Sequence, residues 1–137
     1  MEQKQIDAFE AMLGRGQDSD MLRYTLGNAY FAHAQYHKAI VHLRQACQMN
    51  PSYSTAWKLL GRALAEDGQA HEAVDAFDTA LTVAEENGDK QVAKEVGVFR
   101  RRVIKQLDSE QNGVSADKSD VSDASSTLND TDSPDQS

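Results

Sequence analysis

Three histidines offer the first candidate for chemistry, because imidazole is the commonest metal ligand in proteins. His33, His37 and His42 follow an H-x3-H-x4-H spacing. On one continuous helix, the first two would lie on the same face and could share a metal ion. A break in the helical pattern near residues 34–36 falls between them, and no Asp, Glu or second Cys lies nearby to complete a tetrahedral set. We therefore expect exposed polar histidines and no bound metal.

Nucleophiles and acid–base pairs offer little more. Cys47 is the single cysteine of the 137 residues and lies in an apolar helical pattern, so we expect a buried, unreactive thiol and no intramolecular disulfide. The paired carboxylates at 66–67 and 85–86 fall at predicted helix ends, where solvation is the simpler interpretation. The sequence contains no G-x-S-x-G, phosphate-loop or dinucleotide fingerprint. We therefore predict neither an enzyme nor a cofactor.

The charge of the chain is uneven, although its formal net value is −8. Residues 1–110 carry 13 Lys and Arg against 16 Asp and Glu, whereas residues 111–137 carry one Lys against six Asp. An acidic chain is a poor ligand for nucleic acid, since phosphate attracts a basic surface. The N-terminal segment has no long apolar run, which argues against a signal peptide and a membrane span and favours a cytoplasmic location.

An internal period of 34 residues organises the first part of the chain. Residues 20–53 align with residues 54–87 at seven identical pairs, against roughly two expected by chance. The pairs are Leu26/Leu60, Gly27/Gly61, Ala29/Ala63, Gln35/Gln69, His37/His71, Ala39/Ala73 and Ala46/Ala80. Apolar residues recur at helical spacing in two stretches of each unit, so each unit is predicted to be a pair of helices. Because a mid-helix glycine costs about 1 kcal/mol against alanine, Gly27 and Gly61 predict close helix contacts.

This pattern resembles the tetratricopeptide repeat family, whose 34-residue unit has an aromatic residue, then Leu-Gly, Tyr, Ala, Phe, Ala and Pro at fixed offsets. The first unit supplies Leu26, Gly27, Tyr30, Ala39, Ala46 and Pro51. The second supplies Trp57, Leu60, Gly61, Ala73, Phe77 and Ala80. The first unit departs with Arg23 for the aromatic and Leu43 for Phe, and the second with Leu64 for Tyr and Glu85 for Pro. The resemblance implies an all-α, right-handed α-solenoid of the short stand-alone type that looks bacterial.

The flanks complete an expected domain over residues 1–109. Residues 3–14 carry an apolar stripe and resemble a half repeat, and residues 89–108 are predicted to form a capping helix with one apolar face. With the repeats at 20–53 and 54–87, the predicted total is about six helices. Residues 110–137 are rich in Ser and Asp, and we expect an acidic, disordered tail because few apolar residues are available to bury.

In the resembled family, the first helix of each repeat lines a concave groove that binds peptides. Carried over to this chain, the groove residues are Tyr24, Asn28, Phe31, Lys58, Arg62, Lys90, Lys94 and Arg100. The resemblance thus implies a partly basic, partly aromatic groove for a peptide or partner protein of acidic character. Some family members use a five-residue carboxylate clamp. The five positions fall here on Tyr24, Asn28, Leu59, Lys90 and Lys94, where the clamp expects Lys, Asn, Asn, Lys and Arg. Only Asn28 and Lys90 match, and Lys94 keeps the charge of Arg, so a co-chaperone role with a partial clamp is an alternative.

The sequence therefore predicts a protein–protein adaptor or scaffold. A second interpretation is a structural or assembly protein with weak self-association, in which the short solenoid stacks end to end through its N-terminal helix. The acidic tail has two interpretations as well. It could occupy the basic groove and compete with outside partners, or it could only make the chain more soluble.

Overall fold

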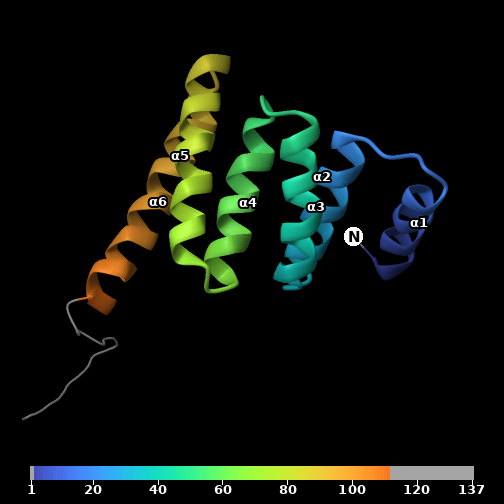
Figure 1. The fold of residues 1–137 in the computed structure, drawn as a ribbon, viewed down its shortest axis with the longest axis horizontal. Helices are drawn as coiled ribbons and strands as arrows, with labels where there is room; N and C mark the ends of the chain where they lie inside the picture. The colour runs from blue at the N-terminus through green and yellow to red at the C-terminus, as the bar shows by residue number, and fades with distance from the viewer. Residues whose placement is uncertain (1, 112–137) are drawn as a thin grey trace, which may run out of the picture. The chain divides into compact units, whose positions relative to one another are not determined.

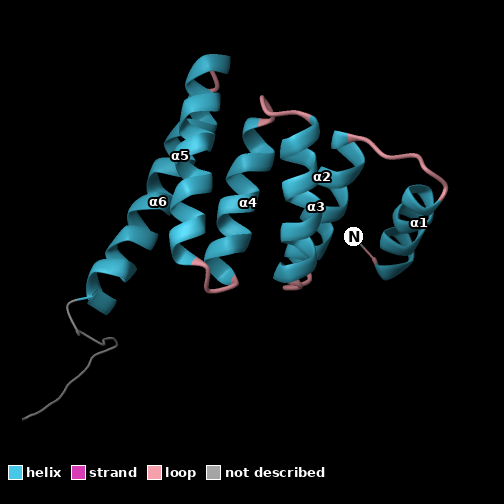
Figure 2. Cartoon of the chain, in the orientation of Figure 1, coloured by secondary structure: helices cyan, strands magenta, loops and turns pink. Residues whose placement is uncertain are grey.

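The computed structural model describes residues 2–111, and all regular secondary structure in that range is α-helical (Figure 2). The helices are α1 (Gln3–Gly14), α2 (Asp20–Ala32), α3 (Tyr36–Met49), α4 (Ser54–Glu66), α5 (Ala70–Asn87) and α6 (Lys90–Gln111). The predicted all-α class with six helices is confirmed. Helix α6 continues past the predicted end at 108, so residues 110 and 111 belong to it, and the rest of the predicted tail lies outside the described residues.

Residues 2–100 form one compact unit that holds α1 to α5 and the first half of α6. Residues 101–111 belong to a second unit and are described here only as the continuation of α6. Within the first unit, α2 packs on α3, α3 on α4 and α4 on α5, so that neighbours in sequence are neighbours in space (Figure 1). This arrangement is typical of stacked helix pairs, in which each pair buries its apolar face against the next.

Small residues allow the helices to approach at the matched positions. A Cβ atom added at Gly27 would lie 2.5 Å from Cγ of Leu43, and one added at Gly61 would overlap the ring of Phe77. Leu43 and Phe77 are themselves fully buried, as are Ala39, Ala46, Ala73 and Ala80. The two glycines are therefore sites of close contact inside each helix pair, which accounts for glycine in the middle of α2 and α4.

The turns inside the two pairs also match. Gly68, between α4 and α5, has a φ of +82°, and Ala34, at the equivalent place between α2 and α3, has a φ of +59°. The next residue closes the turn in both cases, since the Gln35 amide donates to the Tyr30 carbonyl and the Gln69 amide to the Leu64 carbonyl, each at 2.9 Å. Left-handed backbone costs alanine about 1 kcal/mol, so the turn geometry is kept even where the residue is unsuited to it.

Candidate partner-binding face

Helices α2, α4 and the first half of α6 share one face, which we call the α2–α4–α6 face and define by the eight predicted groove residues. Arg62 of α4 joins the three helices. Its guanidinium carbon lies 4.9 Å from the ring centroid of Phe31 on α2 and 4.7 Å from that of Phe99 on α6. Both distances are within the range of a cation–π contact. The charge of Arg62 is therefore held between two aromatic rings.

Phe99 was not among the eight predicted groove residues. Its ring does stack against Phe77 of α5, with centroids 6.2 Å apart, but it also contacts Arg62. The sequence predicted Phe31 and Arg62 as groove residues separately, and the structure brings them together through this contact. Phe99 thus belongs to the face as well as to the core.

Two more of the predicted cations are engaged in ion pairs. Lys58 Nζ lies 2.6 Å from Oε1 of Glu95, and the other carboxylate oxygen of Glu95 accepts a hydrogen bond from Gln91 at 2.9 Å. The hydrogen bond from Lys58 is the main cause that lowers the pKa of the Glu95 carboxyl. Arg100 Nε lies 2.6 Å from Oδ1 of Asp78 on α5. These carboxylates offset much of the positive charge that the sequence placed in the groove.

Lys90 and Lys94 differ from the other cations. Both are exposed on the first two turns of α6, and neither makes an ion pair with another residue of the described range 2–111. They are four residues apart, which places them on the same side of the helix. Asn28 on α2 is exposed too. All three polar side chains are thus exposed.

Tyr24 is half-buried and stacks on Tyr53, with ring centroids 5.1 Å apart at 30°. Burial raises the pKa of the Tyr53 hydroxyl, and the neighbouring Tyr24 and Asp20 add to the effect. Leu59, at the third position of the carboxylate clamp, is buried and apolar. The buried, apolar Leu59 therefore does not support a carboxylate clamp, which needs a polar side chain at this position.

One of the three histidines was predicted wrongly. His33 and His37 are exposed, but His42 is only 8 % exposed and lies under α1. Its Nδ1 is 3.2 Å from Nη1 of Arg23, and its Nε2 is 3.3 Å from Oε2 of Glu10. The periodic pattern held the signal, because position 42 is equivalent to the core position of Ala76. Within residues 2–111, no three potential ligand side chains come together to hold a metal ion.

The cluster around His42 closes the junction between α1 and the first repeat. Glu10 Oε2 accepts a hydrogen bond of 2.5 Å from the Tyr30 hydroxyl, and Arg23 pairs with Asp18 at 2.8 Å. Burial raises the pKa of Tyr30 to about 12, with Glu10 contributing.

Burial also raises the pKa of the Cys47 thiol to about 12, so the thiol stays protonated at neutral pH and is a poor nucleophile.

No helix in the described range is both long and apolar enough to cross a bilayer.

Residues 24–91 match the family model of the tetratricopeptide repeat. A TPR repeat-containing protein of Pseudomonas aeruginosa is 38% identical over 98 residues, which cover 72% of this chain and 93% of the relative. The chain belongs to the tetratricopeptide repeat family.

Solved structures agree with the family. The solution structure of a protein from Bordetella parapertussis has a TM-score of 0.68 at 41% identity, over 79% of this chain and 93% of that one. A TPR domain from Aspergillus fumigatus has the same fold with a TM-score of 0.68 at 24% identity, over 88% of this chain and 77% of that one. Tetratricopeptide proteins act in protein–protein interaction, and this general role applies to the present tetratricopeptide protein.

Proposed function

We propose that this tetratricopeptide protein is an adaptor that binds an acidic segment of another protein on the α2–α4–α6 face. One observation carries the proposal: within the described range, Lys90 and Lys94 are the predicted groove cations that neither a carboxylate nor an aromatic ring engages. Two ammonium groups on one side of a helix attract carboxylates, and such charge complementarity raises the association rate and the specificity of binding more than the affinity.

The neighbouring residues supply the rest of the site. Phe31 and the Tyr24–Tyr53 pair are half-buried rings that offer apolar contact area, and Asn28 can donate and accept hydrogen bonds. Arg62 and Lys58 are already held by Phe31, Phe99 and Glu95, so they shape the face rather than provide free charge. The expected ligand is therefore an extended or helical segment that places carboxylates near α6 and an apolar side chain near α2.

Charge reversal at Lys90 and Lys94 tests the proposal. The probe is a fluorescent acidic peptide that contains one Phe, and the measurement is its affinity by fluorescence anisotropy. Lys90→Glu/Lys94→Glu should weaken binding about tenfold, since each exposed charge contact contributes up to about 1 kcal/mol.

The matched control is Lys4→Glu/Arg15→Glu, which changes the net charge equally at two exposed basic residues that are not among the eight residues of the proposed face. Its affinity should stay within about twofold of the unmodified chain. Equal loss of affinity in both variants would show that only net charge matters, and unchanged affinity in the first would exclude Lys90 and Lys94 from the binding site.

A further inference from the structure

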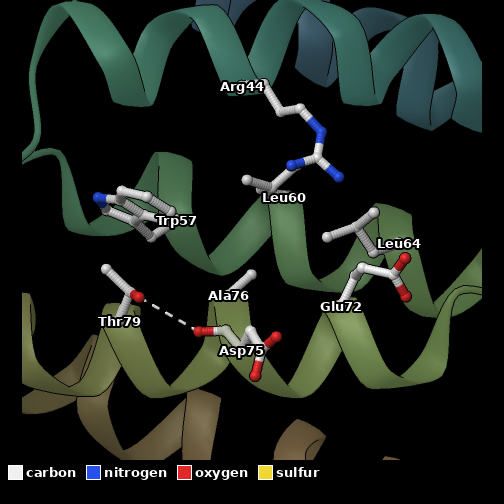
Figure 3. A pocket seen from close by; sticks show the side chains of 8 residues that line it. All are labelled: Arg44, Trp57, Leu60, Leu64, Glu72, Asp75, Ala76 and Thr79. Carbon is white, nitrogen blue, oxygen red and sulfur yellow. Dashed lines mark hydrogen bonds between the residues drawn. The ribbon is translucent and has the colours of Figure 1, made fainter.

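A cleft between α3 and α5, with α4 as its floor, is separate from the α2–α4–α6 face (Figure 3). It has a volume of about 180 Å³ and is lined by Arg44, Trp57, Leu60, Leu64, Glu72, Asp75, Ala76 and Thr79. An adjoining hollow of about 310 Å³ shares Arg44, Trp57 and Leu60 with it and extends to Cys47 and Pro51. None of the eight predicted groove residues lines either space, so the proposed function does not use them.

The two walls of the cleft carry opposite charge. Arg44 reaches in from α3, whereas the carboxylates of Glu72 and Asp75 stand on α5 (Figure 3). Within residues 2–111, none of these three side chains forms an ion pair. By contrast, cation and carboxylate meet within 2.8 Å at Arg23–Asp18 and within 2.6 Å at Lys58–Glu95 and Arg100–Asp78. Complementary charges that face a common space without meeting can both be paired by a ligand that lies between them.

The floor supplies an apolar surface. Trp57 is half-buried, and its indole N–H already donates to the Pro51 carbonyl at 2.9 Å, so the ring can pack against a ligand without leaving a polar atom unpaired. Leu60 and Leu64 follow Trp57 along α4 and are almost fully buried (Figure 3). An apolar side chain that enters the cleft would therefore find a preformed contact surface.

The equivalent place one repeat earlier is closed. Counting back 34 residues takes Arg44 to Glu10, Trp57 to Arg23 and Ala76 to His42. There, Glu10 of α1 reaches across to the Tyr30 hydroxyl and to His42. At the junction under α1, the Glu10 carboxylate thus lies between polar groups and closes the space. The cleft between α3 and α5 is the equivalent space one repeat later, and it is open.

We propose that this cleft is a second docking site, for a segment of a partner protein in which a bulky apolar side chain is flanked by one acidic and one basic residue. The apolar side chain packs on Trp57, the acidic residue pairs with Arg44, and the basic residue pairs with Glu72 and Asp75. Such pairs exclude water at the mouth of the cleft, which strengthens their attraction relative to fully exposed pairs.

The test uses three capped pentapeptides, Ala-Glu-Phe-Lys-Ala, Ala-Glu-Phe-Glu-Ala and Ala-Lys-Phe-Lys-Ala, at up to millimolar concentration. Trp57 is the one tryptophan of the chain, so its fluorescence and the NMR shift of its indole N–H report directly on the cleft. The mixed-charge peptide should bind about threefold more tightly than either like-charged peptide.

Two variants should change which peptide binds most tightly. Arg44→Glu makes both walls acidic and should favour the basic peptide, and Glu72→Lys/Asp75→Lys makes both walls basic and should favour the acidic peptide. The positions changed on the two walls are exposed, so the helices should be retained, which circular dichroism checks. The same order of affinities in all three proteins, or no response of Trp57 to any peptide, would overturn the proposal. Lys90→Glu/Lys94→Glu should leave the Trp57 response unchanged, which separates this site from the one on the α2–α4–α6 face.

Discussion

The junction under α1 and the cleft between α3 and α5 occupy equivalent places in successive repeats, yet one is closed and the other is open. At the first, Glu10 bonds to Tyr30 and His42 and so fixes α1 to the first repeat. At the second, Arg44 stands at the position of Glu10 but pairs with no carboxylate of the described range. The repeat therefore specifies the helices around each junction, whereas a few polar residues determine whether side chains of the chain itself fill it.

Removing the two equivalent side chains gives the largest expected contrast. Glu10→Ala removes the carboxylate that the buried Tyr30 hydroxyl and Nε2 of His42 contact, and the free energy of unfolding should fall by about 1–2 kcal/mol. Arg44→Ala removes an exposed side chain that forms no ion pair within residues 2–111, and it should change the free energy of unfolding by less than about 0.5 kcal/mol. Urea denaturation measures the free energy of unfolding of both variants. Equal losses would mean that the cleft is as much a part of the folded core as the junction is.

The closed junction should also respond to pH, with a smaller effect. Arg23 donates to Nδ1 of His42, so the ring proton sits on Nε2 and faces Glu10. Burial is the main cause that lowers the pKa of His42 below 6.5, with Arg23 acting in the same direction and Glu10 and Asp18 opposing it. The unfolded chain then binds the proton first as pH falls, so the stability contributed by neutral His42 is complete above about pH 6.5 and is lost below it as the imidazole charges.

Unfolding by urea at pH 7.5 and at pH 5 checks this effect. His42→Gln keeps one acceptor and one donor in the cluster but does not titrate, so its stability should change less between the two pH values. His71→Gln, on the exposed side of α5, is the matched control and should retain the pH dependence of the unmodified chain. If His71→Gln lost the pH dependence of stability as His42→Gln does, the dependence would belong to some group other than His42.

Much of the fold was predictable because residues 34 positions apart pack in the same way in the two repeats. The glycines that face Leu43 and Phe77, the buried alanines and the helix breaks all follow from matching residues 34 apart. His42 was predicted wrongly because its polar side chain was read by itself, although Ala76 at the same repeat position is buried. Position in the repeat was the better guide to burial.

The state of the candidate site could not be predicted in the same way. Lys58, Arg62, Lys90 and Lys94 look alike as charges in the sequence. Lys58 is paired by Glu95, which lies 37 residues further along the chain, and Arg62 is held between rings from two other helices. Such neighbours depend on how the helices stack, so only the structure separates the engaged cations from the free ones.

The residues that an acidic peptide contacts on this protein can be mapped by NMR. In a ¹H–¹⁵N NMR titration of the isotopically labelled full chain, the amide signals of Asn28, Lys90, Lys94 and their helical neighbours on α2, α4 and α6 should shift, while those of Glu72, Asp75 and Thr79 should stay in place. Shifts centred on α3 and α5, or no shifts at millimolar peptide, would contradict a partner-binding face built on α2, α4 and α6.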